Sequence, residues 1–424
     1  MSVIVNKTTP RKLFNRNFIL LWQGQLLSQL GSQASLIGMI YGLKTLTGSG
    51  STIGLFMTVS TITSLITGPI AGIIADRYSR KKIIIFADLI SGICMIGLAG
   101  AWFMPDLSVN RLIILMVVIE IVLTAARIFF TPAALASLPD IVPRARLEAA
   151  NSLHSSSISV VRLIGDGAGG VLFRILGAPL LFLIDGITYL TGAFMSLFIN
   201  LSDNHHSKAQ PINGTGFSLS GIKSDLVSGF KLIWHTPGLR QIVILNTIIQ
   251  FFNAPLAIVF PFFIEDYLGL TPDWFGYSLA AMSTGGLIGM ILAGSIPLSG
   301  NRKAFSVLLA IVLAPVLIVI VGFISNVGLL LGCLTCIGLS FSYSGIHITS
   351  VIQRKTAREM RGRVMSNLFT LSMAFTPVSM ALVGLYIDAI GDYVNYIFMS
   401  LGTIMMASQL PLLFNSKLRK FISE

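Results

Sequence analysis

Apolar stretches of about 20 residues recur along the whole sequence, separated by short segments that are charged or rich in Gly and Pro. Hydrophobic residues make up 54% of the 424 residues and charged residues only 11%, against about 25% in a soluble domain. A helix of about 20 apolar residues crosses a bilayer, so the pattern predicts an all-α polytopic membrane protein. Twelve spans are expected, over residues 18–41, 51–75, 83–103, 112–136, 149–176, 179–201, 239–264, 273–298, 303–325, 327–352, 363–388 and 392–416.

The positions of the basic residues predict the orientation in the membrane. The net charge is +12, and most of the 29 Lys and Arg residues lie near the N-terminus, in alternate loops and near the C-terminus. Cytoplasmic loops carry such an excess, so both termini are expected in the cytoplasm. A nucleic-acid partner would need a soluble basic face, and none is predicted. The opposite membrane face gathers Asp106, Glu265, Asp266, Asp273 and Asp392.

The longest hydrophilic interval divides the chain into two halves. It covers residues 202–238, contains Pro211 and the run Gly214-Thr215-Gly216, and falls between the sixth and seventh spans. We therefore expect a cytoplasmic linker there. The other parts are then an N-terminal cytoplasmic segment, two six-helix bundles and a cytoplasmic tail, over residues 1–17, 18–201, 239–416 and 417–424.

Polar residues inside two spans indicate an internal repeat. Gln25, Gln29 and Ser32 share one face of the first span. At a constant offset the seventh span repeats the pattern, with Asn246, Gln250 and Asn253. Such a match is expected of two parallel six-helix halves, although polar residues also recur by topology alone. We predict that these six side chains line a substrate cavity, and interhelical hydrogen bonding is the alternative.

A dense charge cluster lies between the second and third spans. A positive-inside loop explains its basic residues but not the acid, Asp76, which follows a small residue, Gly72, by four positions. A small residue permits close helix approach, and a carboxylate can cap a facing helix terminus. The sequence there is Gly72-Ile-Ile-Ala-Asp76-Arg77-Tyr78-Ser79-Arg80-Lys81-Lys82.

This cluster resembles the signature loop of the major facilitator superfamily at every defining position. Other stretches are similar to the branch of that family that contains macrolide-efflux proteins and the enterobactin exporter. Those stretches run from Arg127 to Ala136, Pro139 to Val142, Asn151 to Leu153 and Arg361 to Ser366. The resemblance implies two pseudo-symmetric six-helix bundles that rock about a central cavity, which gives alternating access.

The same resemblance implies a role for the loop as a latch on the cytoplasmic side. Asp76 would meet the start of the eleventh span near Gly362 and Arg363. Arg77 and Arg80 would bridge neighbouring helices. Leu298 stands where a second copy of Asp76 would align, so the latch is expected to be asymmetric. The predicted gating motif consists of Gly72, Asp76, Arg77, Arg80 and Lys81.

Ionisable residues inside the first six spans predict a proton path, because such groups are costly in a bilayer and mark ion or substrate pathways. We estimate the depth of each residue from the outer end of its helix at about 1.5 Å per residue. The acids then lie in the outer half of the membrane and the arginines lie near the midplane. An arginine 4 Å away attracts a carboxylate by about 4 kcal/mol at an effective dielectric of about 20, enough to change its proton affinity. The candidates are Asp166, Glu120, Asp185, Arg127 and Arg162.

The proton path has one structural alternative, and one acid is not assigned to it. Static ion pairs could lock the helices together, for example Arg162 with Asp166 at i, i+4. Asp88 is left out, because snorkelling or capping near the end of the third span explains it equally well. Asp166 ranks first and Glu120 second, since Gly165 to Gly170 is similar to an antiporter motif of drug exporters in the superfamily, with Asp166 replacing its proline.

The sequence as a whole predicts a secondary transporter in a bacterial cytoplasmic membrane. It would export a bulky, amphipathic small molecule, such as a macrolide or a siderophore, in exchange for protons, and act as a monomer. No phosphate-cradling motif or catalytic cluster occurs, so no enzyme activity, cofactor or metal is expected. An importer or lipid flippase of the same fold, or a receptor without transport, remains an alternative.

Overall fold

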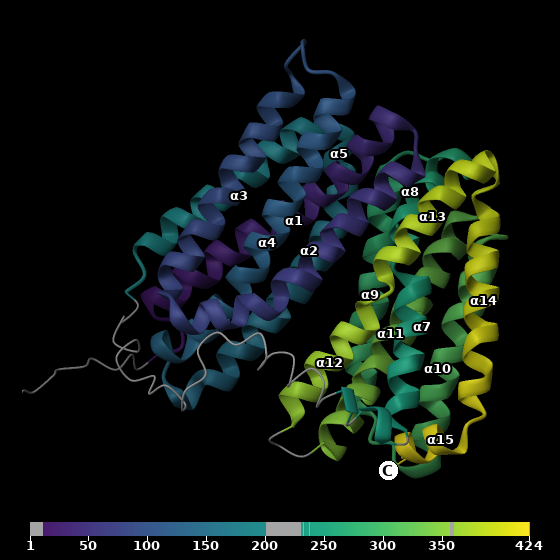
Figure 1. Cartoon of the computed structure of the whole chain (residues 1–424). Coiled ribbons are helices and arrows are strands. Elements are labelled where there is room, and N and C mark those ends of the chain that lie inside the picture. Colours follow the sequence, from purple (N-terminus) through teal and green to yellow (C-terminus); the bar gives the residue numbers. More distant parts are fainter. Residues whose placement is uncertain (1–11, 201–229, 232, 237, 357–359, 424) are drawn as a thin grey trace, which may run out of the picture. The chain divides into compact units, whose positions relative to one another are not determined.

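The computed structural model describes residues 12–200, 230–231, 233–236, 238–356 and 360–423. Within these residues every regular element is a helix, and no β-strand occurs (Figure 1). Most of the linker expected over 202–238, and most of the N-terminal segment expected over 1–17, lies outside the described residues. Because the described residues form helices and no β-strand, the predicted all-α class is confirmed.

The first half of the chain forms long helices joined by short turns. Clusters of small, polar or charged residues, such as Gly48 and Ser49, separate the apolar runs. The helices are α1 (Arg16–Thr47), α2 (Gly50–Arg77), α3 (Arg80–Trp102), α4 (Val109–Ile141), the short η1 (Arg144–Arg146) and α5 (Leu147–Leu197).

α5 contains two spans that meet at a break. Gly177 has φ 71° and ψ 172°, a backbone conformation outside the helical region. A side chain there would be strained, whereas glycine adopts positive φ at little cost. Pro179 follows inside the second part, where its missing N–H is tolerated at a helix start. The predicted boundary between the fifth and sixth spans, at 176–179, coincides with this break.

The second half contains more and shorter helices, because prolines interrupt the apolar runs. Pro255 separates α7 from α8, and Pro377 lies in the first turn of α13. The helices are α7 (Leu239–Asn253), α8 (Leu256–Phe262), the π-helical η3 (Phe263–Tyr267), α9 (Asp273–Ser295), α10 (Gly300–Val321), α11 (Val327–Lys355), α12 (Arg361–Met373), α13 (Thr376–Ile390), η4 (Gly391–Tyr393), α14 (Asn395–Leu413) and α15 (Ser416–Ser423).

The helix lengths match twelve membrane crossings. Ten helical segments among the described residues are long and apolar enough to cross a bilayer. One of these is α5, which holds two of the expected spans on either side of Gly177. α1 is not among the ten and carries Gln25, Gln29 and Gln33, but its 32 residues exceed the roughly 20 that a crossing needs.

Packing divides the chain into two compact units. The first unit consists of Met1–Leu36, Ile66–Gly165 and Ala178–Gly214, and the second unit of Ile37–Leu65, Asp166–Gly177 and Thr215–Glu424. The boundaries between the units fall within α1, α2 and α5. The bundle limits predicted from the sequence, on either side of 202–238, stay a prediction.

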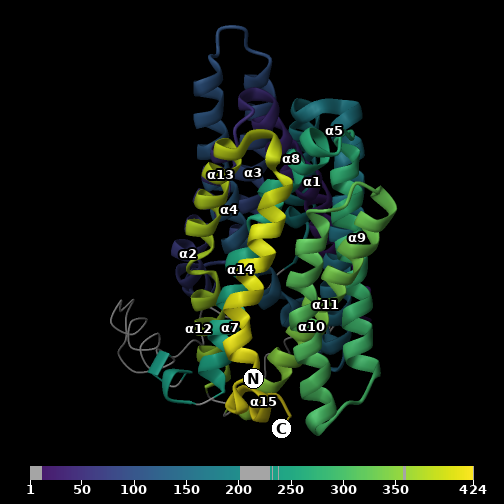
Figure 2. The ribbon, with the colours of Figure 1, turned by 90° about the vertical axis from the view of Figure 1, so that its right-hand side faces the viewer.

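Each unit has its own helix contacts. In the first unit α3 packs against α4, and a buried cluster that includes Phe18, Ala75, Ile84, Leu138 and Ala150 joins five helices, α1 to α5. In the second unit α11 packs between α9 and α10, and α10 also contacts α14 (Figure 2). α15 is amphipathic and buries Leu418, Phe421 and Ile422.

Candidate functional site

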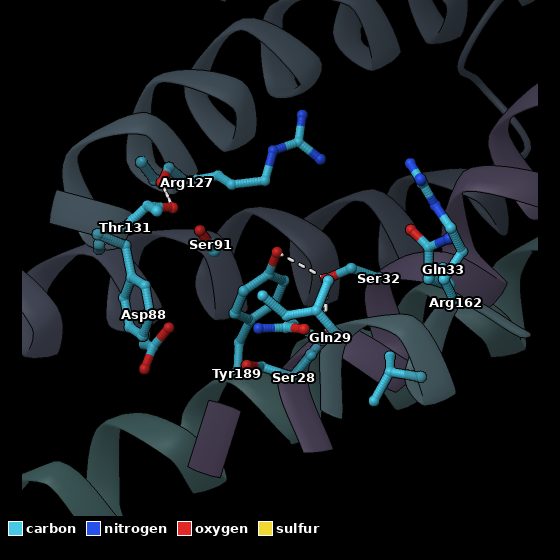
Figure 3. A pocket seen from close by; sticks show the side chains of 15 residues that line it. Ser28, Gln29, Ser32, Gln33, Asp88, Ser91, Arg127, Thr131, Arg162 and Tyr189 are labelled. Carbon is cyan, nitrogen blue, oxygen red and sulfur yellow. Dashed lines mark hydrogen bonds between the residues drawn. The ribbon is translucent and has the colours of Figure 1, made fainter. Parts of the chain in front are cut away.

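A cavity of about 360 Å³ lies among α1, α3, α4 and both parts of α5 in the first unit (Figure 3). Four predicted site residues line it: Gln29, Ser32, Arg127 and Arg162. Phe130, Ile158 and Val161 provide apolar wall. Its volume falls in the range of small-molecule pockets, about 300–1,000 Å³. The sequence thus identified both a polar face and the arginines of one cavity.

Asp185 lies beside this cavity without lining it, and hydroxyl groups of α1 bind its carboxyl group. Its side chain is 1% exposed. Ser35 Oγ donates to Asp185 Oδ2 at 2.6 Å, and Ser32 Oγ lies 3.3 Å from Oδ1. Ser32 Oγ also lies 2.8 Å from the hydroxyl of Tyr189, which lines the cavity. A chain of hydroxyl groups therefore connects the buried carboxylate with the cavity.

A second buried carboxylate reaches the cavity through a threonine. Glu120 is 6% exposed and accepts a hydrogen bond of 2.8 Å from Thr124 Oγ1. Arg127 Nη2 donates to the same hydroxyl at 3.2 Å. α4 therefore carries, on one face, an acid, a hydroxyl and a cavity-lining guanidinium, because positions 120, 124 and 127 follow the helical period.

Sequence reasoning missed Asp88 as a site residue. The side chain is 5% exposed and lines the cavity together with Ser91, one turn further along α3. The shared helical face of Asp88 and Ser91 was the available signal. The sequence explained Asp88 by snorkelling or capping. Neither applies to a side chain that is buried within the first unit and has no hydrogen bond with a described residue.

Asp166 belongs to the second unit, whereas the cavity residues belong to the first. Ser283 Oγ of α9 donates to Asp166 Oδ2 at 3.0 Å. The backbone approach there is close, since a Cβ at Gly276 would come within 2.8 Å of the Asp166 carbonyl oxygen. The structure thus brings Glu120, Asp185 and the two arginines into one unit and assigns Asp166 other neighbours.

The polar face of α7 is used mainly for contacts between helices. Asn246 Nδ2 donates to Ser372 Oγ of α12 at 2.7 Å, and Gln250 Nε2 lies 3.6 Å from Met373 Sδ. Within the described residues, Asn253 Oδ1 is buried and has no hydrogen-bond partner. Gln25 of α1 is 7% exposed. The interhelical alternative thus applies to Asn246 and Gln250.

The basic residues of the loop motif bind α3 to its neighbours. Arg80 Nη1 donates to the carbonyl oxygen of Ala136 at 2.6 Å and to Asp140 Oδ2 at 2.9 Å. Lys81 Nζ donates to the carbonyl oxygen of Leu197 at 2.7 Å. Gly72 and Arg77 lie in the last turns of α2. The side chains of Asp76 and Arg363 are outside the described part of the chain, so the expected contact of Asp76 with the start of the eleventh span stays a prediction.

Lys44, at the end of α1, is the centre of a charge cluster in the second unit. It is 8% exposed, and its Nζ lies 2.5 Å from Glu265 Oε2, 3.0 Å from Asp266 Oδ1 and 3.0 Å from the Pro261 carbonyl oxygen. The π-helical turn of η3 presents both acids at this point. The sequence had only assigned these charges to one membrane face.

Asp388 of α13 caps the N-terminus of α2. Its carboxylate accepts hydrogen bonds from the backbone N–H of Gly50 at 2.5 Å and of Ser51 at 3.1 Å, and from Ser49 Oγ at 2.9 Å. An anionic group at this end of a helix is favourable, since the first N–H groups have no intrahelical partner.

No group of three or more His, Cys, Asp or Glu side chains that could hold a metal ion occurs in the described ranges. The comparisons with known proteins decide the family. A model of the Major Facilitator Superfamily matches residues 21–377. The chain belongs to the major facilitator superfamily. It therefore belongs to a family of membrane transporters, and its helical fold matches that of solved transporters.

Curated members of the superfamily that are similar to the chain include efflux proteins. Macrolide efflux protein A of Streptococcus pyogenes is 25% identical, covering 92% of this chain and 93% of the relative. The multidrug efflux pump Tap of Mycolicibacterium fortuitum is 24% identical, covering 85% and 86%.

Solved structures of other superfamily members share the fold. A peptide transporter POT matches with a TM-score of 0.71 and 15% identity, covering 98% of both chains. A D-xylose-proton symporter matches with a TM-score of 0.71 and 13% identity, covering 96% of this chain and 99% of the other.

Proposed function

We propose that this protein exports a bulky, amphipathic small molecule from a bacterial cell by alternating access, in exchange for protons. The observation that carries the proposal is its similarity, over most of its length, to relatives named as macrolide and multidrug efflux proteins. The cavity of the first unit supports it, because polar and apolar groups share its wall. A macrolide or a siderophore is the leading substrate class.

The cavity residues suit a solute with mixed chemistry. Gln29 and Ser32 offer hydrogen bonds on α1, and Phe130 packs apolar groups on α4. A solute that leaves water for this cavity keeps its polar groups paired, so burial costs less.

Protons would bind at carboxylates that hydroxyl groups connect to the cavity. Asp185 reaches it through Ser32 and Tyr189, and Glu120 through Thr124. Arg127 donates a hydrogen bond to the Thr124 hydroxyl beside Glu120, so movement of this arginine would rearrange the hydrogen bonds of the acid. Asp166, hydrogen-bonded to Ser283, would respond to movements of α9. Substrate export and proton entry would be coupled because both change the packing of the helices that carry these acids, α4 and α5.

In this proposal the gating motif controls the cytoplasmic side of the membrane. Arg80 and Lys81 would hold α3 against α4 and α5, and Asp76 would complete the latch. Both termini would lie in the cytoplasm, in keeping with the positive-inside pattern. The protein would work as a monomer.

The test is substrate-triggered collapse of a preformed pH gradient in everted membrane vesicles. Macrolides, dyes and siderophores would be screened with the wild type and with Asp185→Asn, Glu120→Gln and Asp166→Asn. An exposed acid, Asp106, provides the control Asp106→Asn. Collapse with the wild type and the control, reduced at least tenfold in one or more of the three variants, supports proton antiport. Flux of a compound without any change in the pH gradient contradicts it.

A further inference from the structure

The cavity of the first unit is lined by one buried acid, Asp88, and two arginines, Arg127 and Arg162, that form no ion pair with it. Asp88 has no hydrogen bond or ion pair with any described residue, although it is 5% exposed. The ion pairs within 4 Å between described side chains include neither Arg127 nor Arg162. Arg127 and Arg162 are exposed and line the cavity, whereas Asp88 is buried. A buried acid without a partner is costly in a membrane protein, and it marks a place where a ligand or a transported ion binds.

The two kinds of charge lie at different ends of the cavity. In Figure 3 the carboxylate of Asp88 lies at the lower left of the Ser32 and Tyr189 hydroxyl pair, the guanidinium group of Arg127 lies above that pair, and the guanidinium group of Arg162 lies to its upper right. Glu120 lies near Arg127 through the shared Thr124 hydroxyl, and Asp185, which is hydrogen-bonded to Ser32 and Ser35, attracts Arg127 from outside the cavity wall. Neither acid lines the cavity itself. The cavity therefore has an anionic end and a cationic end.

The wall between these ends is neutral. Gln29 and Ser91 present an amide and a hydroxyl, and Phe130 and Val161 present apolar surface. A solute that spans the cavity would contact apolar groups with its body and opposite charges with its two ends. This arrangement selects by charge as well as by shape, because a misplaced charge would be repelled at one end.

We propose that the cavity binds a zwitterionic solute, with its ammonium-type group at Asp88 and its anionic group at Arg127 and Arg162. This deepens the proposed function, on which it rests, by naming the substrate class. A solute with only a positive charge would pair with Asp88 but would face two guanidinium groups. A solute with only a negative charge would leave Asp88 without a counter-ion in the occupied cavity.

Three dyes with one ring system test the charge selection. Tetramethylrhodamine is zwitterionic, its methyl ester is cationic, and carboxyfluorescein is anionic. Binding to the full-length protein in lipid nanodiscs would be measured by fluorescence anisotropy, which requires no transport. We expect the wild type to bind the zwitterion at least tenfold more tightly than either of the other dyes.

Substitutions then assign each end of the cavity. Asp88→Asn should weaken binding of the zwitterion at least tenfold and leave carboxyfluorescein binding equal or tighter, which also shows that the variant is folded. Arg127→Gln and Arg162→Gln should weaken the zwitterion and spare the methyl ester. Asp106→Asn and Arg111→Gln alter exposed residues and should change each dissociation constant by less than twofold.

Several results would overturn the proposal. These are tighter binding of the cationic ester than of the zwitterion, equal zwitterion binding by Asp88→Asn and the wild type, or no binding of any of the three dyes. Failure of the proposed function would look different. In that case the dyes bind with the expected charge order, but neither the zwitterion nor any other compound crosses the membrane of proteoliposomes.

Discussion

Ser35 donates a hydrogen bond of 2.6 Å to Asp185, and this contact joins the middle of α1 to the second part of α5. Both side chains are buried, at 5% and 1% exposed. α1 and α5 approach closely next to this bond, since a Cβ at Gly31 would come within 2.7 Å of Asp185 Oδ1. The carboxylate is therefore fixed by packing as well as by hydrogen bonding.

Ser35→Ala should lower the stability of the protein by about 1–3 kcal/mol, because it removes a donor from a buried acid. The measurement is thermal unfolding in detergent, followed by loss of the monodisperse peak in size-exclusion chromatography. Ser159→Ala, on the exposed side of α5, is the control. Equal melting of the two variants would show that the Ser35 contact contributes nothing.

Asp388→Ala should destabilise the second unit by about 1–2 kcal/mol. The substitution removes the carboxylate that accepts three hydrogen bonds at the start of α2, and loss of a helix cap costs about this much. The apparent melting temperature gives the measurement. Asp392→Ala removes an exposed acid of the following turn and should leave that temperature unchanged. A similar decrease in both variants would contradict the capping role.

Lys44→Met should destabilise the second unit more than Lys44→Arg does. Methionine keeps much of the side-chain volume but leaves Glu265 and Asp266 without their shared counter-ion. Removing one partner of a buried pair costs about 3–5 kcal/mol, and the partial exposure of the two acids, at 25% and 41%, reduces the expected loss to about 1–3 kcal/mol.

The measurement for Lys44 is again the apparent melting temperature, at low and at high salt. The difference between Lys44→Met and the wild type should narrow at high salt, because ions screen the repulsion between the two remaining acids. A loss that stays the same at both salt concentrations would assign the role of Lys44 to packing, including its contact with the ring of Phe262.

Arg80→Gln should reduce transport by at least tenfold and stability by about 1–2 kcal/mol. Glutamine cannot form the ion pair to Asp140 or replace the two charge-assisted hydrogen bonds that Arg80 Nη1 donates to Asp140 and to the Ala136 carbonyl oxygen. Lys82→Gln, a neighbouring exposed basic residue, is the control for the loss of one positive charge. Flux assays in vesicles and melting temperatures would both be recorded. Equal flux in the two variants would remove Arg80 from the gating motif.

Local sequence information was sufficient for the helices and the family. Apolar runs of about 20 residues have few stable alternatives to helices in a bilayer, since every backbone N–H and C=O must be paired internally. The break at Gly177 lies at the predicted boundary between the fifth and sixth spans, where Gly177 and Pro179 stand close together, although single prolines such as Pro69 and Pro315 lie inside helices. The motif from Gly72 to Lys82 is enough to indicate the superfamily, because its residue types and their spacing lie within one short stretch of the chain.

The site was predicted only in part, because periodicity gives the face of a helix but not the neighbour that the face meets. Gln29, Ser32, Arg127 and Arg162 were assigned to a site and do line the cavity. Asp88 was left out, since its depth along α3 said nothing of the helices packed against it.

The sequence by itself determined the membrane class, the helices and the family, all of which depend on composition and local spacing. Only the tertiary structure decided which polar groups meet. It brought Ser35 to Asp185 and Lys44 to Glu265 over more than a hundred residues, and it gave Asp166 a partner on α9. The physical reason is that the rotation and offset of packed helices depend on the shapes of both surfaces, which no single span encodes.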